Sequence, residues 1–388
     1  MATRILVNIS ELTTNDPSLG DETVYGRLHD AAILVDDDRV LWVGHHADAP
    51  DADERLDVGG GAVVPGFVDS HTHLVFAGER SDEFEARMAG ARYDGGGIMR
   101  TVDATRAASY DSLHDAASAR LGELRAGGVT TVEMKSGYAL NVEGEARLIE
   151  LAASFTDEVT FLGAHVVPPE FHDDRSGYLD LVTGSMLDAC APSSKWVDVF
   201  CDTGAFDVDE ARRIIDAGVA HGLLPRVHAN QLGNTGGVQL AIDVNAASVD
   251  HCTYLNDDDV EALAASTTVA TLLPGAEFST RSPYPSARRL LDAGVVVALA
   301  TDCNPGTSYV TSMPFIIALA VREMGVTFDE ALWAVTRGGA RALRRSDVGH
   351  LGIGARADLV ILDAPRAAHL AYRPGGAVIR ATLRSNRD

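Results

Sequence analysis

The chain has 388 residues, of which 46% are hydrophobic and 23% are charged, a globular balance that excludes a disordered or fibrous protein. Its 56 acidic and 32 basic residues give a formal net charge of -24, which argues against binding to nucleic acids or anionic membranes, since both require a basic surface. Only Lys135 and Lys195 are lysines, and the other basic residues are arginines. Because an acidic, lysine-poor surface stays hydrated in concentrated salt, we expect a halophilic host.

The N-terminal segment has no basic region followed by a long apolar run, so the sequence predicts no secretory signal. Its apolar runs are also shorter than a membrane span. We therefore expect a soluble protein of the cytoplasm. The cysteines have no CxxC spacing and are expected to be reduced and buried: Cys190, Cys201, Cys252 and Cys303.

Short β-rich runs lie at both ends of the chain, at 5–9, 31–36 and 40–44 and again at 358–364 and 375–384. Small β segments at opposite ends of a chain usually pair. We expect a composite β-sandwich domain formed by residues 1–61 and 349–388, and a second domain formed by residues 62–348.

The second domain has eight apolar, strand-like runs separated by helical stretches. The runs cover residues 62–71, 129–137, 160–167, 196–202, 224–230, 247–252, 268–275 and 295–302. The clearest helices are expected at 112–126, 209–221, 257–265 and 286–293. Strands that are apolar throughout and alternate with helices indicate a parallel sheet covered on its faces. We predict an α/β fold with a (β/α)8 TIM-like barrel; a doubly wound open sheet is the alternative.

Most of these runs end in polar residues, and the carboxyl ends of barrel strands are where catalytic groups meet. His71 and His73 have the period-two spacing that turns both side chains to one side of an extended chain. His228 and Asp302 end later strands and complete a set of nitrogen and oxygen ligands. Imidazole and carboxylate ligands suit Zn(II) or Fe(II), and either ion can activate a water molecule.

Several motifs resemble those of the metal-dependent amidohydrolase superfamily, and within it the imidazolonepropionase family. They are PGFVDSHTH, HTHLVFAGER, GGGIMRTVDATR, TTVEMKSGYAL, FLGAHVVP, VHAN, SVDH and ATDCNPGTS, which run from residue 62 to about residue 310. The resemblance implies a barrel with a small β domain made from both chain ends, and a homodimer. It also implies hydrolysis of the lactam C–N bond of 4-imidazolone-5-propanoate to N-formimino-L-glutamate in histidine degradation.

The resemblance implies that His71, His73, His228 and Asp302 bind one divalent metal ion, Zn(2+) or Fe(2+/3+). Asp302 is also expected to accept a proton from the attacking water. His251 matches no ligand of the family, and we assign it to polarising the substrate carbonyl or activating the water. A second ion is not expected, since neither Lys135 nor Lys195 occupies the position of the bridging lysine found in some relatives.

Arg80 matches a substrate-binding arginine, and its guanidinium suits the propanoate group. The other positions that the resemblance assigns to the substrate are Tyr93, Tyr138, His165, Gln231, Asn304, Gly306 and Thr307. Position 231 is Glu in some relatives, and because a glutamine amide only hydrogen-bonds, we assign Gln231 an orienting role. Two other functions stay open. One is a different cyclic amidohydrolase or aminohydrolase, acting on a purine or a hydantoin, and the other is a non-catalytic scaffold.

Overall fold

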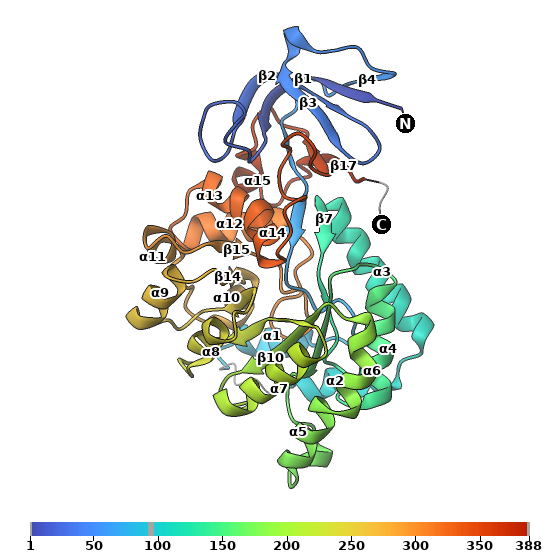
Figure 1. The fold of residues 1–388 in the computed structure, drawn as a ribbon, viewed down its shortest axis with the longest axis vertical. Helices are drawn as coiled ribbons and strands as arrows, with labels where there is room; N and C mark the ends of the chain where they lie inside the picture. Colours follow the sequence, from blue (N-terminus) through green and yellow to red (C-terminus); the bar gives the residue numbers. More distant parts are fainter. Residues whose placement is uncertain (1, 92–96, 386–388) are drawn as a thin grey trace. The chain divides into compact units, whose positions relative to one another are not determined.

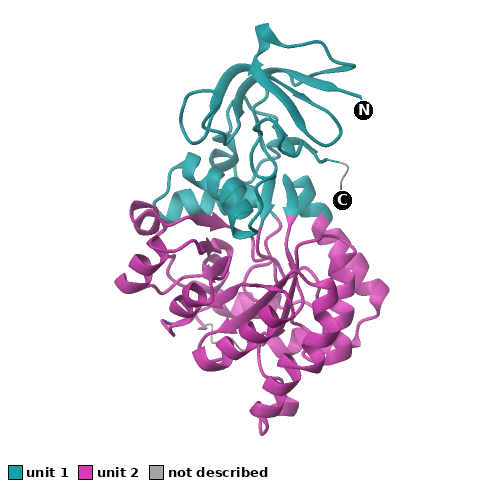
Figure 2. Cartoon of the chain, in the orientation of Figure 1, with its two compact units in different colours: residues 1–69, 122–131, 312–388 teal, residues 70–121, 132–311 magenta. Residues whose placement is uncertain are grey.

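A computed structural model describes residues 2–91 and 97–385 of the chain (Figure 1). The chain divides into two compact units, each formed from separate stretches of sequence (Figure 2). Unit 1 comprises Met1–Asp69, Gly122–Thr131 and Ser312–Asp388, and unit 2 comprises Ser70–Leu121 and Val132–Thr311.

Unit 1 contains a seven-stranded sheet to which both ends of the chain contribute. Its strands follow the order β17-β16-β5-β1-β2-β3, and β4 pairs with β1. Their bounds are β1 (Arg4–Thr13), β2 (Arg27–Val35), β3 (Val40–His45), β4 (Glu54–Asp57), β5 (Val63–Pro65), β16 (Leu359–Leu362) and β17 (Ile379–Leu383). The N-terminal strands reach the C-terminal ones through β5, which pairs with β1 at Leu12–Val63 and with β16 at Pro65–Leu359. Burial of these apolar side chains stabilises the sheet.

The helical part of unit 1 follows the second unit in the sequence. It consists of α12 (Met313–Glu323), α13 (Phe328–Trp333), a π-helical turn (Ala334–Gly338), α14 (Gly339–Ala342) and α15 (His369–Tyr372). None of these helices was among those expected from the sequence. Near the N-terminus, a short 3-10 helix (His46–Asp48) follows β3.

The apolar run at 62–71, which the sequence predicted as one strand, forms two strands. The first is β5, and the second is β6 (Phe67–Asp69), which pairs with β7 (Val129–Val132). Gly66 lies between them, where a Cβ atom would meet the Thr130 Oγ1 atom at 2.2 Å. The chain changes partners at a residue that only glycine can occupy, because any side chain there would collide with Thr130.

Unit 2 is built on a parallel sheet in the order β15-β14-β13-β12-β10-β9-β8, with β11 paired to β10. The bounds are β8 (Met134–Lys135), β9 (Val159–Ala164), β10 (Trp196–Cys201), β11 (Leu224–Pro225), β12 (Val227–Ala229), β13 (Ser248–His251), β14 (Val269–Leu272) and β15 (Val297–Leu299). The segment containing Thr72 closes the barrel, since Thr72 bridges to Cys303 and its carbonyl accepts a hydrogen bond from the Lys135 N–H. The predicted α/β barrel is confirmed.

The helices of unit 2 follow the strands and cover the outside of the sheet (Figure 1). They are α1 (Ser81–Met88), α2 (Ile98–Ala107), α3 (Tyr110–Ala126), α4 (Val142–Ala153), α5 (Arg175–Thr183), α6 (Ser185–Cys190), α7 (Val208–Ala220), α8 (Gly237–Asp243), α9 (Asp257–Ala264), α10 (Pro274–Thr280) and α11 (Ala287–Asp292); α3 ends in unit 1. Short 3-10 helices occupy Pro169–Phe171 and Ala191–Ser193. Within residues 2–91 and 97–385, no helix combines the length and the apolar character needed to cross a membrane.

Candidate active site

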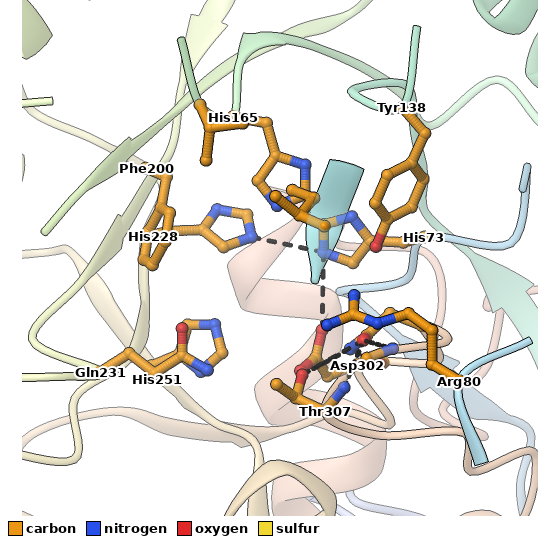
Figure 3. A pocket seen from close by; sticks show the side chains of 14 residues that line it. His73, Arg80, Tyr138, His165, Phe200, His228, Gln231, His251, Asp302 and Thr307 are labelled. Carbon is orange, nitrogen blue, oxygen red and sulfur yellow. Dashed lines mark hydrogen bonds and ion pairs between the residues drawn. The ribbon is translucent and has the colours of Figure 1, made fainter. Parts of the chain in front are cut away.

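Four side chains from the carboxyl ends of the barrel strands converge on one point in unit 2. The His71 Nε2 and His73 Nε2 atoms each lie 3.5 Å from the Asp302 Oδ1 atom. The His228 Nε2 atom lies 3.4 Å from the His73 Nε2 atom. Figure 3 shows His73, His228 and Asp302 pointing toward one another. The convergence that the sequence predicted for these residues is therefore present.

The spacing of these atoms fits a bound metal ion. Two ligands at about 2.0–2.1 Å from a tetrahedral zinc ion are about 3.4 Å apart, close to the separations found here. The buried His71 Nε2 atom makes no hydrogen bond to the described part of the chain, although it is a strong polar group. His71, His73 and Asp302 have ligand atoms close enough to share one ion, as have His71, His228 and His251. The residues present therefore fit a divalent cation.

The electrostatics of the cluster also favour a cation. Burial lowers the pKa values of the His71, His73 and His251 imidazoles well below the ordinary value, so these rings are neutral and offer lone pairs. Burial raises the pKa of the Asp302 carboxyl well above its usual value, which means that an isolated carboxylate here is unfavourable. A divalent cation beside Asp302 would offset this cost.

Two buried aspartates, which the sequence analysis did not identify as functional residues, hold the far sides of the histidine rings. The Asp250 Oδ2 atom lies 2.8 Å from the His71 Nδ1 atom, and the Asp198 Oδ2 atom lies 3.0 Å from the His228 Nδ1 atom. A carboxylate beside Nδ1 favours a proton on that nitrogen and turns Nε2 toward the metal. Each aspartate is a charged residue inside an otherwise mostly apolar strand, which marks it as unusual but does not indicate its partner.

Buried cations balance these carboxylates. The Lys135 Nζ atom donates to Asp198 Oδ2 at 2.9 Å and to Glu133 Oε1 at 2.8 Å. The Arg226 Nη2 atom donates to Asp250 Oδ2 at 3.1 Å. Burial by itself would raise the pKa of Asp198, but the nearby His228 and Lys135 hold it below the ordinary value. Lys135 therefore balances the charge of Asp198, the carboxylate that contacts His228, inside the barrel.

Replacing Asp250 by asparagine is expected to weaken metal binding about 10–100-fold, because the His71 ring loses the charged carboxylate that orients it and is left with a neutral amide. Competition with a chelator measures this change directly, and circular dichroism checks the fold. Asp180→Asn is the matched control, since Asp180 is exposed and pairs with Arg213 on the surface. Equal metal affinity in wild type and Asp250→Asn would show that Asp250 does not orient His71.

A pocket opens onto the cluster. It is lined by His73, Arg80, Ile98, Tyr138, His165, Val166, Phe200, His228, Gln231, His251, Asp302, Asn304, Gly306 and Thr307. Every predicted substrate-binding residue except Tyr93 is among them, and Tyr93 lies outside the described residues. The sequence analysis missed Ile98, Val166 and Phe200, because apolar residues at a strand end or a helix start carry no chemical signal of their own.

The loop after β15 is shaped by Asn304. Its side chain accepts hydrogen bonds from the Gly306 and Thr307 N–H groups at 2.8 and 2.7 Å and donates to the Asp302 carbonyl at 2.6 Å. An asparagine that binds the backbone two residues ahead is a typical turn-forming residue. Asp302 itself has a left-handed backbone, with φ 52°, which is uncommon outside glycine. This tight turn directs the Asp302 carboxylate into the pocket.

Gln231 and His165 are anchored at the rim by hydrogen bonds to the Asp202 carboxylate and the Gly137 carbonyl, respectively. The Gln231 N–H donates to the Asp202 Oδ2 atom at 2.6 Å, so the carboxylate that ends β10 anchors the loop after β12. The His165 Nδ1 atom lies 3.0 Å from the Gly137 carbonyl, and burial lowers the pKa of His165 to about 3. His165 is therefore neutral, and its ring lies stacked on that of His73 with centroids 5.4 Å apart. Both Gln231 and His165 line the pocket together with His73, His228 and Asp302 (Figure 3).

Arg80 approaches the pocket from the N-terminus of α1. Its Nε and Nη2 atoms donate to the two carboxylate oxygens of Glu83 at 2.9 and 2.7 Å. Gly306 lies against the other side of the guanidinium, where a Cβ atom would be 2.5 Å from Arg80 Nη1. The sequence analysis predicted Arg80 as a pocket residue but did not identify Glu83.

Comparisons with known proteins agree with this geometry. The model of the amidohydrolase family matches residues 94–386. Imidazolonepropionase of Streptomyces griseus subsp. griseus is 60% identical over 385 residues, covering 99% of this chain and 99% of that protein. Imidazolonepropionase of Mycolicibacterium smegmatis is 60% identical over 385 residues, covering 99% of this chain and 97% of that protein.

Two solved structures share the fold at low sequence identity. One is a mutant of atrazine chlorohydrolase from Arthrobacter aurescens TC1 complexed with zinc and atraton, with a TM-score of 0.74, 17% identity, and coverage of 98% of this chain and 93% of that one. The other is an adenosine deaminase from Xanthomonas campestris with bound zinc, with a TM-score of 0.71, 17% identity, and coverage of 98% and 91%. The chain belongs to the amidohydrolase family, and within it to the imidazolonepropionases.

Proposed function

We propose that this chain hydrolyses the lactam C–N bond of 4-imidazolone-5-propanoate, giving N-formimino-L-glutamate in histidine degradation. One observation carries the proposal: a single pocket contains both a buried arginine, Arg80, and a cluster of side chains that could hold a metal ion. The cluster suits hydrolysis of a cyclic amide, and the arginine suits the carboxylate of the substrate. The relatives named imidazolonepropionase support the same assignment.

His71, His73, His228 and Asp302 would hold one divalent ion, Zn(2+) or Fe(2+/3+). When bound, such an ion supplies Lewis-acid chemistry that makes water a nucleophile at neutral pH. The zinc in the two solved structures supports a metal in this fold. The imidazoles of His71 and His73 are neutral donors, and Asp302 provides a negatively charged oxygen ligand.

Asp302 accepts the proton of the attacking water on its second oxygen, Oδ2, which lies 3.4 Å from the Thr307 hydroxyl. That hydroxyl donates to the carboxylate and holds it in orientation. His251 lies on the facing side of the pocket and polarises the lactam carbonyl or activates the water (Figure 3). The His251 Nδ1 atom is buried and makes no hydrogen bond within the described residues, so it is available to a ligand.

The remaining pocket residues bind and orient the substrate. Arg80 binds the propanoate, and Gln231 orients the ring through its amide. The other residues that we assign to the substrate are Tyr93, Tyr138, His165, Asn304, Gly306 and Thr307. Together they hold the ring with its carbonyl carbon near the proposed metal ligands.

A turnover assay tests the proposal. The protein is loaded with Zn(II) or Fe(II) and mixed with freshly generated 4-imidazolone-5-propanoate, and loss of the imidazolone absorbance and formation of N-formimino-L-glutamate are followed. Adenosine and a hydantoin are assayed as alternative substrates, because the alternative amidohydrolase or aminohydrolase function would act on a purine or a hydantoin. Turnover of either competitor in preference to the imidazolone would assign the pocket to the other amidohydrolase function. Absence of both turnover and bound metal would favour a scaffold.

We also propose the setting in which the enzyme works. It is a cytoplasmic protein of a halophilic host and forms a homodimer. Residues 1–61 and 349–388 form its composite β-sandwich domain, and residues 62–348 form the catalytic barrel. The formal charge of -24 supports the halophilic assignment and argues against nucleic acids and membranes as partners.

The melting temperature is expected to rise between 0.1 and 3 M KCl by at least about 4 °C, since salt screens the repulsion among the excess carboxylates. Differential scanning calorimetry measures the change. A non-ionic osmolyte at equal osmolality is the control, because it alters hydration without screening charge. A melting temperature independent of KCl would contradict the halophilic assignment.

A further inference from the structure

Glu83 holds the guanidinium of Arg80 through both of its oxygens. The Arg80 Nε atom donates to Glu83 Oε1 at 2.9 Å, and the Arg80 Nη2 atom donates to Glu83 Oε2 at 2.7 Å. The Arg80 side chain is 5% exposed and that of Glu83 is 22% exposed, so solvent screens this pair less than a surface ion pair. A planar guanidinium bound at two atoms to one carboxylate has a fixed orientation.

Two glycines make room for this ion pair. A Cβ atom at Gly97 would lie 2.3 Å from Glu83 Oε1 and 2.7 Å from Arg80 Nη2. A Cβ atom at Gly306 would lie 2.5 Å from Arg80 Nη1. The guanidinium thus lies in a narrow slot between Gly97 and Gly306. The Nη1 edge faces the loop that lines the pocket, while Glu83 occupies the opposite edge.

Glu83 also lies close to two other arginines. Its carboxylate is 3.7 Å from Arg87 and 3.4 Å from Arg100, and Arg100 pairs with Asp82 at 2.9 Å. The Arg100 side chain is 51% exposed, whereas those of Arg80 and Arg87 are each 5% exposed, so Glu83 holds two buried guanidiniums beside the pocket.

We propose that Glu83 is a positioning residue for substrate specificity: it fixes the Arg80 guanidinium in the orientation that binds the carboxylate of the substrate. The inference rests on the proposed function, in which Arg80 binds the propanoate. Glu83 does not contact the reacting atoms, so it acts on binding and leaves the chemical step unchanged. Arg87 completes the frame, because its Nη2 atom donates to the Gly306 carbonyl at 2.8 Å.

Glu83→Gln tests this role, since glutamine keeps the shape but presents an N–H group to Arg80 in place of one acceptor. We expect the Michaelis constant for 4-imidazolone-5-propanoate to rise about tenfold while kcat stays within about twofold of wild type. Asp82→Asn is the matched control, because Asp82 lies on the same helix and pairs with Arg100. This control is expected to keep the wild-type Michaelis constant.

Two inhibitors separate the carboxylate effect from general damage to the pocket. Imidazole-4-propanoate keeps the charged chain, and 4-propylimidazole has a chain of the same length without the charge. The inhibition constant of imidazole-4-propanoate is expected to rise about tenfold in Glu83→Gln, and that of 4-propylimidazole is expected to stay constant. Melting temperature and metal content are measured alongside, and Glu83→Asp, which keeps the charge but shortens the reach, is expected to give an intermediate increase.

The outcomes distinguish this inference from the proposed function. If wild type does not prefer imidazole-4-propanoate over 4-propylimidazole, Arg80 does not bind the carboxylate and the proposed substrate contact is wrong. If wild type has that preference and Glu83→Gln keeps it in full, Glu83 does not position Arg80. Tighter binding in Glu83→Gln would mean that Glu83 competes with the substrate, and equal weakening of both inhibitors would mean that the pocket has collapsed. Either result overturns the inference.

Discussion

Replacing His73 by alanine is expected to abolish turnover and to remove most of the bound metal. His73 Nε2 lies 3.5 Å from Asp302 Oδ1 and 3.4 Å from His228 Nε2, at the centre of the ligand cluster. Loss of one imidazole removes a ligand from the coordination set. We therefore expect metal affinity to fall by more than about a hundredfold, which exceeds the effect of removing a residue that only orients a ligand. Metal analysis after dialysis and a turnover assay measure the two effects.

The control for this variant is His221→Ala. His221 lies at the end of α7, where it contacts the surface residue Asp188 at 3.0 Å. It is expected to keep full metal content and activity, which excludes a general effect of removing an imidazole. Full activity of His73→Ala at wild-type metal content would contradict the assignment of His73 as a ligand.

Replacing Arg80 by alanine is expected to weaken binding of the substrate by about 2–4 kcal/mol, or roughly 30- to 1,000-fold, because a buried charge-assisted contact with the propanoate is lost. The effect falls mainly on the Michaelis constant, since the propanoate is remote from the bond that breaks. Steady-state kinetics over a wide range of substrate concentration measures it. Metal content is expected to remain at the wild-type value, since Arg80 is not among the ligands.

Arg213→Ala is the matched control for Arg80→Ala. Arg213 is an exposed arginine on α7, with 47% of its side chain accessible, and it pairs with Asp180. Exposed ion pairs contribute little to stability, so this variant is expected to match wild type in both kinetic constants. An unchanged Michaelis constant in Arg80→Ala would count against the propanoate contact.

The barrel and the convergence of its proposed metal ligands were predictable because their signals are local. The helix expected at 209–221 is observed at Val208–Ala220, and the one expected at 257–265 at Asp257–Ala264. Both begin with a capping box, which is set by residues three apart. His71, His73 and Asp302 were predictable in the same way, since each follows an apolar strand and parallel barrel strands all end at one rim.

The partners of these residues were not predictable from local patterns. Asp198 and Asp250 lie inside apolar strands, and nothing in their neighbouring residues indicates that they face the Nδ1 atoms of His228 and His71. The split of the strand at 62–71 depends on Thr130, which packs against Gly66 from a distant part of the sequence. Each of these contacts joins residues on separate segments of the chain, so no pattern of neighbouring residues could reveal it.

The amino-acid sequence by itself determined the strand and helix alternation, the acidic surface and the residue types at the rim, since these follow from composition and from periodicity along the chain. Only the tertiary structure decided which carboxylates pair with which cations. The bidentate contact of Glu83 with Arg80 illustrates this: Glu83 is one of three acidic residues in α1, and its contact with Arg80 fits in the narrow space between Gly97 and Gly306. Ion pairs require precise distances and orientations, and these arise only when the chain has packed.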